Sequence, residues 1–317
     1  MQRKALVVTH GGRPDAIAAR VEVGNQLQQA GFEITDYEDA LGSFLSTDVL
    51  KAAGDPIFQA HEDQYRALAA EAEIVIVLGG DGTILRAAEL VHGSQTPILG
   101  INLGHVGFLT GSERGDLPAA ISQVVHRQYT IDQRNTIEVR ITPAPGQPEV
   151  TGWALNEATL EKANRERMVE VVIGIDGRPV SSFGCDGVVM STATGSTAHA
   201  FSAGGPIIWP DVAGTVIVPL SAHALFARPM VIGPQSTAVV ELLERTRTQG
   251  VVTMDGRRRI DLQPGGRITV TSSPTKIRLV RLGSAPFTDR LVRKFELPVN
   301  GWRGPAVLGP QEDADAG

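Results

Sequence analysis

The clearest indication of how this chain folds is the run Ile74-Val75-Ile76-Val77-Leu78-Gly79-Gly80-Asp81-Gly82-Thr83. Its five consecutive apolar residues indicate a strand that is buried on both faces, as in a parallel sheet. Gly79 and Gly80 end that strand, and residues 84–91 are predicted to form the next helix. A further strand over residues 97–101 completes a unit in which a helix joins two parallel strands.

The pattern on either side of this unit extends the prediction to the whole chain. A strand over residues 5–8 and a helix near residues 15–30 precede it, whereas short alternating or β-branched runs follow beyond about residue 130. In that second half Asp176-Gly177 is a hairpin signal. We therefore predict an α/β fold with an N-terminal parallel-sheet α/β domain and a second, β-rich C-terminal domain.

Composition limits the classes of partner. A length of 317 residues allows two domains or one large domain, and 42% hydrophobic residues can fill a substantial core. The net charge of −6 provides no general basic field, so no nucleic acid partner is expected. The short basic run at residues 257–259 is most simply a solvated turn.

Cysteine usage and hydropathy point to the cytoplasm. Cys185 is the only cysteine, which excludes an intramolecular disulfide and fits a reducing compartment. No signal peptide is visible at the N-terminus, and the longest mainly apolar stretch, residues 216–230, is interrupted by polar residues and proline. We predict a cytoplasmic protein without a membrane partner.

The loop Gly79-Gly80-Asp81-Gly82-Thr83 is placed where ligands bind in parallel sheets. It follows the carboxyl end of a strand and opens a helix, whose first N–H groups attract anions, and its glycines let a phosphate approach the backbone. It lacks the Gly-Lys-Ser/Thr ending of a Walker A loop and carries Asp81 instead. A carboxylate beside phosphate fits a bridging Mg²⁺ or a proton acceptor for an attacking hydroxyl. The alternative is a tight turn with Asp81 as a helix N-cap.

Two further segments carry hydrogen-bonding groups. Asn156-Glu157 pairs an amide with a carboxylate and suits a ribose diol or a base edge, although for a dipeptide taken alone an ordinary strand-end turn is the simpler interpretation. Residues 186–206 lead from a strand into a hydroxyl-rich glycine turn and a short helix. This cation-free segment suits a nucleoside better than a phosphate, the alternative being a helix capped by Ser196 or Thr197.

Other motifs are weaker. His61-Glu62 lacks the second histidine of a zinc-protease helix and is expected on a surface helix. No set of histidines has metal-ligand spacing, so no residue is assigned to a protein-built metal site. The glycines of residues 100–108 do not follow the dinucleotide fingerprint, and we interpret this segment as a strand end and a close-packed turn.

Taken in chain order, Gly79-Gly80-Asp81-Gly82-Thr83, Asn102-Leu103-Gly104 with Gly107-Phe108, Asn156-Glu157 and Thr194-Gly195-Ser196-Thr197-Ala198 closely resemble the NAD kinase family. The glycine-aspartate loop is shared with lipid kinases and resembles the phosphofructokinase loop, whereas the hydroxyl-rich segment selects NAD kinases. The ending at residues 289–303 resembles actinobacterial members.

The resemblance implies an enzyme that transfers a phosphoryl group from ATP or polyphosphate to the 2′-hydroxyl of the adenosine ribose of NAD. It implies a divalent metal cofactor, Mg²⁺, and a homodimer or homotetramer. Asp81 becomes the catalytic proton acceptor. The implied substrate- or nucleotide-binding residues are Gly82, Arg86, Asn156, Glu157, Arg167, Asp186, Thr197, Ala198, His199, Ala200, Phe201 and Ser202. Asp255-Gly256-Arg257 matches another family motif without an assigned role.

The same resemblance divides the chain. Residues 1–130 are expected to form the α/β phosphate-donor domain and residues 131–282 the β-rich NAD-binding domain. Residues 283–304 are expected to pack back on the N-terminal domain, and residues 305–317 to form a disordered tail. The choice between ATP and polyphosphate, the oligomer size, acceptance of NADH and regulation are left open by the sequence.

Two positions depart from the family pattern Thr-Pro-Thr-Gly-Ser-Thr-Ala-Tyr. Ala193 replaces its proline and His199 its tyrosine, so the chain is predicted to bind NAD more weakly than a tyrosine-bearing relative. Two other functions share some of the motifs. A lipid kinase would need a membrane-facing basic helix, which is not seen, and a non-catalytic dinucleotide sensor would have little use for Asp81 beside phosphates.

Overall fold

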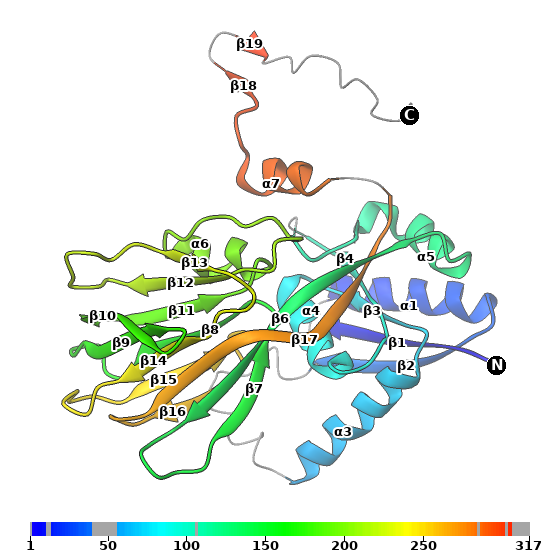
Figure 1. Cartoon of the computed structure of the whole chain (residues 1–317). Helices are drawn as coiled ribbons and strands as arrows, with labels where there is room; N and C mark the ends of the chain where they lie inside the picture. The colour runs from blue at the N-terminus through cyan, green and yellow to red at the C-terminus, as the bar shows by residue number, and fades with distance from the viewer. Residues whose placement is uncertain are drawn as a thin grey trace.

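The computed structural model describes residues 2–10, 14–39, 56–104, 107–283, 286–301 and 304–305 (Figure 1). The predicted disordered tail lies outside these ranges from residue 306 onward. Among the described residues, no helix is both long and apolar enough to cross a bilayer.

The first half of the chain alternates strands with helices around a parallel sheet in the order β2-β1-β3-β4. Its elements are β1 (Arg3–His10), α1 (Pro14–Gln29), β2 (Phe32–Asp39), α3 (Pro56–Glu71), β3 (Ile74–Leu78), α4 (Asp81–Val91), β4 (Ile98–Asn102), β5 (Ser112–Glu113), η2 (Arg114–Asp116) and α5 (Leu117–Val125).

The strand and helix predicted around the glycine-aspartate loop are confirmed. All five residues of β3 are buried, as expected for a strand covered on both faces. The helix begins at Asp81 rather than at residue 84, because the loop itself forms the first turn. The backbone N–H groups of Thr83 and Ile84 donate to the carbonyl oxygen of Gly80 at 3.0 and 3.2 Å.

Helices cover both faces of this sheet. Apolar side chains of α1 and α5 share one core cluster, and those of α3 and α4 share another on the opposite face. The neighbouring strands β1 and β3 are therefore followed by helices on opposite faces. Such a reversal creates a crevice at the carboxyl ends of the two strands, where ligands of open α/β sheets bind.

The second half of the chain is rich in antiparallel strands, as predicted. Its elements are β6 (Thr130–Thr142), β7 (Val150–Ala154), β8 (Glu157–Lys162), β9 (Val169–Ile175), β10 (Arg178–Cys185), β11 (Gly187–Ser191), η3 (Gly195–Thr197), α6 (His199–Ser202), β12 (Thr215–Leu220), β13 (Met230–Ile232), β14 (Ala238–Leu242), β15 (Gly250–Met254), β16 (Arg258–Leu262), β17 (Arg267–Arg281), α7 (Phe287–Phe295), β18 (Asn300–Gly301) and β19 (Gly304–Pro305). The hairpin predicted at Asp176-Gly177 joins β9 to β10.

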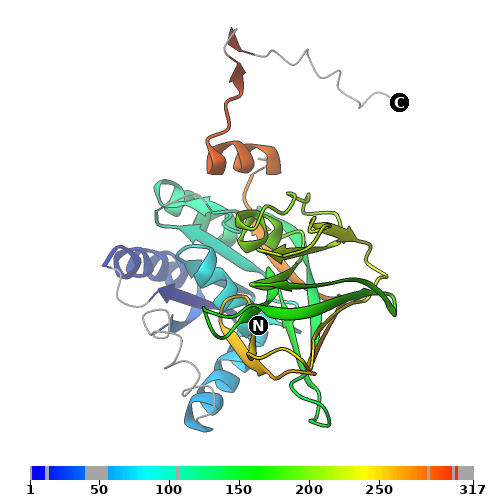
Figure 2. The ribbon, with the colours of Figure 1, turned by 90° about the vertical axis from the view of Figure 1, so that its left-hand side faces the viewer.

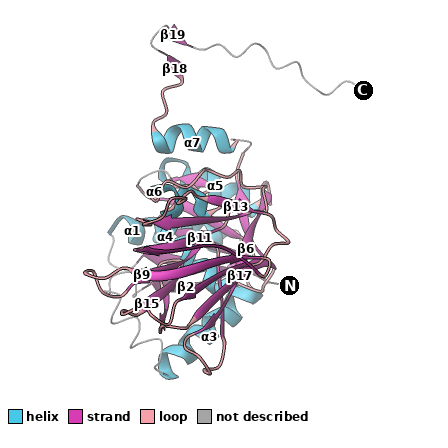
Figure 3. Ribbon diagram, turned by 60° about the vertical axis from the view of Figure 1, so that its left-hand side comes forward, coloured by secondary structure: helices cyan, strands magenta, loops and turns pink. Residues whose placement is uncertain are grey.

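Two sheets build this half. One is a six-stranded antiparallel sheet in the order β13-β12-β11-β8-β15-β16. The other contains β6, β9, β14 and β17, of which Figure 3 labels β6, β9 and β17. Apolar residues from both sheets form one core cluster between them. This packing buries alternate side chains of β14, whereas all five residues of β11 are buried because Val189 packs in a second cluster on the opposite face.

The two halves share one sheet, which the sequence did not indicate. The long strand β17 pairs with β6 and β14, and near its end Leu279 pairs in parallel with Ile98 of β4. The parallel strands and part of the β-rich half thus form an 11-stranded sheet. Figures 1 and 2 show α7 at one end of the molecule, above α5 and α6.

Candidate active site

Asp81 lies at the carboxyl end of β3. This is the crevice created where the helices that follow β1 and β3 cover opposite faces of the sheet. Its carboxylate accepts hydrogen bonds from the backbone N–H groups of Phe108 (3.1 Å to Oδ2) and Leu109 (3.2 Å to Oδ1). The helix N-cap is Gly80, without a side-chain cap. The N-cap interpretation of Asp81 is therefore wrong, because its carboxylate is held by a segment that follows the next strand.

Close backbone approach fixes the surroundings of this carboxylate. A Cβ atom at Gly107 would lie 2.3 Å from Oδ1 of Asp81, and one at Gly100 would lie 2.4 Å from Cδ1 of Ile84. Only glycine lets the segment after β4 pack this tightly on the start of α4. The predicted strand end, at Asn102, and the close packing at Gly100 and Gly107 are confirmed, while residues 105 and 106 of this segment lie outside the described ranges. Its two N–H donors to Asp81 were not foreseen.

Space remains open on the other side of the loop. A Cβ atom at Gly80 or Gly82 would have no atom within 4 Å. The first-turn N–H groups at a helix N-terminus form a ready anion site. The loop therefore combines a fixed carboxylate with exposed backbone that a phosphate can approach.

Asp255 positions the Asn156-Glu157 pair. This carboxylate is 4% exposed and accepts hydrogen bonds from the backbone N–H groups of Leu155 (3.0 Å), Asn156 (2.7 Å) and Glu157 (3.3 Å). It also accepts a bond from Arg258 at 2.7 Å. Asp255 has a positive φ of 51° in the turn between β15 and β16. The sequence left the Asp255-Gly256-Arg257 motif without a role and did not reveal these contacts.

Glu157 is held largely in its neutral form. The residue is 8% exposed, and among the described residues its Oε2 has no hydrogen-bond partner. Burial and, secondarily, the charge of Asp255 raise the pKa of Glu157 to about 8, against a lowering by the backbone N–H of His199. Near neutral pH this carboxyl group can therefore donate a hydrogen bond as well as accept one.

The hydroxyl-rich segment lies directly on Leu155 and Asn156. Thr192 Oγ1 donates to the carbonyl oxygen of Leu155 at 2.6 Å, and Ser191 Oγ to that of Asn156 at 3.1 Å. A Cβ atom at Gly195 would lie 2.2 Å from the same Asn156 oxygen. The structure thus brings these two segments together, and several of the hydroxyls hold them in contact.

The capping alternative for this segment is wrong. The N-cap of α6 is Ala198, without a side-chain hydrogen bond. Ser196 is fully buried and instead bonds the carbonyl oxygen of Ala193 (2.6 Å) and the N–H of Ile208 (2.9 Å). It therefore fixes the chain that follows the helix.

The predicted binding residues after Ser196 differ in exposure. Ala200 is fully buried in a small core cluster, so its side chain supports the segment. Thr197, Ala198 and His199 are half-buried, and Phe201 and Ser202 are exposed. Five of these six residues are thus at least partly exposed, so a ligand can contact them.

Three other predicted binding residues lie apart from this cluster. Arg86 is 3% exposed, and its guanidinium contacts Glu89 (2.7 Å), the Tyr37 hydroxyl (Nε, 3.0 Å) and Glu62. Exposed Arg167 lies in the turn between β8 and β9, and Asp186 pairs with Lys162 at 2.5 Å. The register places Asp186 at the opposite end of β11 from the strand's contact with Glu157. Ligand contacts of these three residues stay predictions.

The segment after β17 contacts both parts of the site. Phe295 of α7 lies 5.7 Å from Phe108 and 4.3 Å from Phe201, measured between ring centroids. Phe287 lies 5.9 Å from Phe108 and 5.1 Å from Trp209. Helix α7 therefore touches the N-terminal segment that holds Asp81 and also the β-rich half.

Comparison with known proteins assigns the family. Family models described as the ATP-NAD kinase N-terminal and C-terminal domains match residues 5–129 and 155–282. The NAD kinase of Leifsonia xyli subsp. xyli is 55% identical over 309 residues, covering 96% of this chain and 98% of its own. The chain belongs to the NAD kinase family.

Further relatives agree with this assignment. The NAD kinase of Thermobifida fusca is 48% identical over 308 residues, covering 96% of this chain and 93% of its own. The resemblance predicted from the motifs is thus confirmed, including its actinobacterial character, and membership makes the chain a kinase.

Solved structures of NAD kinases share the fold. Yeast NADH kinase complexed with NADH superposes with a TM-score of 0.78 at 20% identity, covering 94% of this chain and 89% of its own. An NAD kinase from Archaeoglobus fulgidus in complex with ATP has a TM-score of 0.68 at 23% identity, covering 92% and 98%. The predicted fold class is confirmed.

The described residues are compatible with a metal ion that binds together with the donor phosphates, rather than with one bound by protein ligands alone. Across the described part of the chain, no group of three or more His, Cys, Asp or Glu side chains is arranged to hold a metal ion. Mg²⁺ characteristically keeps several waters and binds one or two carboxylates together with substrate phosphates. Asp81 supplies one carboxylate beside an open helix N-terminus, which is compatible with that arrangement.

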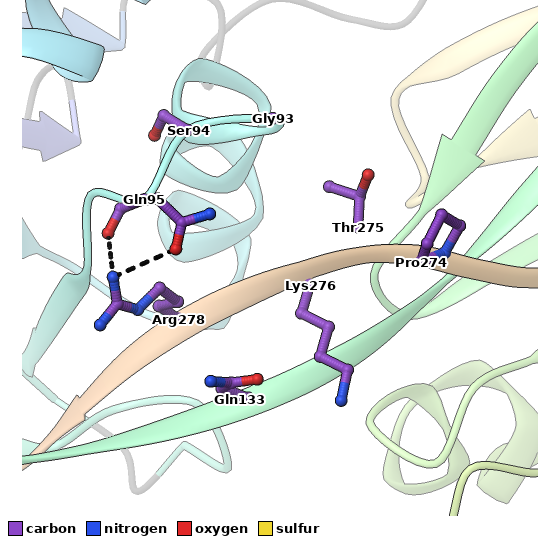
Figure 4. Close-up of a pocket in the computed structure, with 8 residues that line it drawn as sticks. All are labelled: Gly93, Ser94, Gln95, Gln133, Pro274, Thr275, Lys276 and Arg278. Carbon is purple, nitrogen blue, oxygen red and sulfur yellow. Dashed lines mark hydrogen bonds between the residues drawn. The ribbon is translucent and has the colours of Figure 1, made fainter.

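A polar cavity elsewhere contains none of the predicted site residues. It encloses about 400 Å³ between the turn after α4, the bulged part of β17 and β6, and is lined by Gly93, Ser94, Gln95, Gln133, Pro274, Thr275, Lys276 and Arg278 (Figure 4). Arg278 Nη1 donates to the carbonyl oxygen of Gln95 at 2.7 Å. Gln95 precedes β4, so this cavity is at the amino ends of the parallel strands, away from Asp81.

Proposed function

We propose that this NAD kinase family member transfers a phosphoryl group from ATP or polyphosphate to the 2′-hydroxyl of the adenosine ribose of NAD, giving NADP. The observation that carries the proposal is the carboxylate of Asp81, held by two backbone N–H groups at the crevice of the parallel sheet. A proton acceptor fixed beside a phosphate-accessible helix N-terminus is what hydroxyl phosphorylation requires.

In this proposal Asp81 accepts the proton of the ribose 2′-hydroxyl as that oxygen attacks the terminal phosphorus of the donor. The bond to the leaving phosphate breaks, and the remaining nucleotide or polyphosphate departs. The backbone around Gly82 receives the donor phosphates, which the open space beside this glycine supports. Arg86 anchors α4 through its buried ion pairs, and any direct contact with phosphate would need a change of partners.

The adenosine part is proposed to lie on Asn156, Glu157 and the segment Thr197–Ser202. Glu157, with its raised pKa, can donate a hydrogen bond to a ribose or base acceptor, while Asn156 offers both a donor and an acceptor. Exposed Phe201, whose ring packs against Phe295, provides an aromatic face in this segment. Arg167 lies in the turn after β8 and Asp186 directly precedes β11, so both would contact a more distant part of NAD.

A divalent metal is proposed as cofactor, with Asp81 as the protein group nearest to it. When bound, Mg²⁺ supplies neutralisation of the negative charge on the donor phosphates. The chain's own contribution is to orient the carboxylate, for which the N–H groups of Phe108 and Leu109 are responsible.

A homodimer or homotetramer in the cytoplasm is also proposed. The edge strand β13 has an exposed Val231, and the preceding loop carries exposed Leu225 and Phe226. Exposed apolar side chains next to an unpaired strand edge favour association with another copy of the chain. Sedimentation equilibrium of the purified protein measures the mass directly, and a monomer at micromolar concentration would contradict this part.

The function is tested by incubating the purified protein with NAD, Mg²⁺ and either ATP or polyphosphate. NADP is detected with an NADP-specific dehydrogenase, which identifies the product and the donor together. Asp81→Asn is expected to keep NAD binding while turnover falls by about 10²–10⁴-fold, the usual worth of a general base. Folded protein that binds NAD but makes no NADP with either donor would favour the sensor function instead.

A further inference from the structure

A second cavity lies between the carboxyl end of β17 and α7. It encloses about 470 Å³, and its principal walls are Asp132, Arg134, Trp209, Arg281, Phe287 and Arg290. The first two residues belong to β6, Arg281 ends β17, and the last two belong to α7, which stands beyond that strand end (Figure 1). None of these residues is used in the proposed transfer of phosphate to NAD.

Positive charge in this cavity exceeds the negative charge that faces it. Oδ2 of Asp132 accepts bonds from Arg134 (Nη2, 2.7 Å) and Arg281 (Nε, 3.1 Å) and is the shared acceptor for both guanidinium groups. Arg290 adds a third cation to the wall. The other wall carboxylate, Asp211, is exposed at the surface, where water screens its charge.

The excess charge is buried. Arg134 is 4% exposed and Arg281 is 7% exposed, while Arg290 is half-buried. In the described part of the chain, Nη2 of Arg281 is buried without a hydrogen-bond partner. Burial, then the charges of Arg290 and Arg134, lower the pKa of Arg281 to about 9. Uncompensated buried charge is costly, and an anion that enters the cavity would remove part of that cost.

We propose that this cavity binds a phosphoryl dianion, either inorganic phosphate or the terminal phosphate of a polyphosphate chain, between Arg134, Arg281 and Arg290. Guanidinium groups bind phosphate oxygens with paired, charge-assisted hydrogen bonds. A dianion would offset the two positive charges that Asp132 leaves uncompensated. Trp209 and Phe287, whose ring centroids lie 5.1 Å apart, form the apolar part of the wall.

The cavity is linked to the active site by Arg281. Its Nη1 donates to the carbonyl oxygens of Leu109 (3.1 Å) and Thr110 (2.9 Å), and the N–H of the same Leu109 holds Asp81. Arg290 is 3.4 Å from the carbonyl oxygen of Phe108, the other residue that bonds Asp81. An anion bound here would therefore contact the two arginines that hold the segment orienting the catalytic carboxylate.

The test measures binding of inorganic phosphate and of tripolyphosphate to the full chain by calorimetry at constant ionic strength, without NAD or metal. Arg290→Gln removes one charge-assisted bond and is expected to weaken binding by about tenfold or more. Arg293→Gln is the matched control. It removes the same charge from α7 one helical turn after Arg290, but Arg293 is not part of the cavity wall. Its binding is expected to stay within about twofold of the parent.

A third variant separates this cavity from the active-site loop. Asp211→Asn removes the negative charge at the rim and should tighten phosphate binding by about twofold to fivefold, the range for an exposed charge. A phosphate bound only at the Asp81 loop would not respond to Asp211. Tighter binding of tripolyphosphate than of phosphate identifies a chain terminus as the ligand, and equal binding identifies free phosphate. Unchanged binding in folded Arg290→Gln, or equal loss in Arg293→Gln, overturns the proposal.

Discussion

Replacement of Gly107 by alanine tests whether the position of the Asp81 carboxylate limits turnover. The new Cβ would lie 2.3 Å from Oδ1 of Asp81, 0.7 Å inside the 3.0 Å that real Cβ contacts respect. Either the carboxylate or the segment after β4 must move by about that distance or more. The hydrogen bonds from Phe108 and Leu109, at 3.1 and 3.2 Å, would then be lengthened or lost.

A misplacement of about 1 Å at a reacting group costs about 100-fold in rate, or about 2.7 kcal/mol in activation free energy. We therefore expect kcat of Gly107→Ala to fall by about 100-fold, with little change in the KM for NAD, because Asn156 and Glu157 lie on another segment. NADP formation is followed with an NADP-specific dehydrogenase at saturating donor. Gly115→Ala is the control, since a Cβ there has no atom within 4 Å.

A double-mutant comparison distinguishes this mechanism from general loosening of the fold. If Gly107→Ala acts through Asp81, it should add little to the defect of Asp81→Asn, because residues that act as a unit are not additive. Full additivity, or wild-type kcat in a folded Gly107→Ala protein, would refute the reasoning.

Three further changes test other parts of the site. Burial raises the pKa of Glu157 from 4.5 to about 8, so between these pH values the folded state binds more protons than the unfolded state. The free energy of unfolding should therefore fall as pH rises through that window. Glu157→Gln should flatten this part of a plot of Tm against pH, and an unchanged slope would contradict the assignment. Asp255→Asn weakens the acceptor for three backbone N–H groups and Arg258. We expect the free energy of unfolding, measured with denaturant, to fall by roughly 3 kcal/mol and the KM for NAD to rise. A loss of stability with an unchanged KM would limit Asp255 to a folding role. His199→Tyr keeps the backbone N–H that faces Glu157 and introduces the aromatic ring that the family has at this position, so the KM for NAD should decrease. An unchanged KM would show that the histidine does not weaken NAD binding.

Much of the fold could be predicted because the decisive signals are local. The apolar run Ile74–Leu78 and the glycines after it specify a buried strand and its end, and Asp176-Gly177 specifies a hairpin without reference to the rest of the chain. Pairing between distant segments has no such signal. The parallel contact of Leu279 with Ile98, which joins the two halves in one sheet, depends on how both halves pack.

The same division holds for the active site. Asp81 was proposed from its position at a strand end, where ligands bind, whereas Asn156-Glu157 was proposed from the family resemblance. The groups that position them, Asp255 and the N–H donors of Phe108 and Leu109, come from turns whose contacts depend on tertiary structure. Arg86 was expected to face the site from its helical spacing, but spacing does not reveal the buried acids that engage its guanidinium.

The sheet shared by the two halves makes them interdependent during folding. An N-terminal fragment that stops before β6 would leave the outer edge of β4 without β17, and the core residues Ile98 and Leu99 would lie next to unpaired backbone. Exposed edges of this kind recruit strands from other molecules and lead to aggregation. The chain must therefore be synthesised to the end of β17 before its first sheet is complete, so the N-terminal half is not expected to work as an exchangeable module.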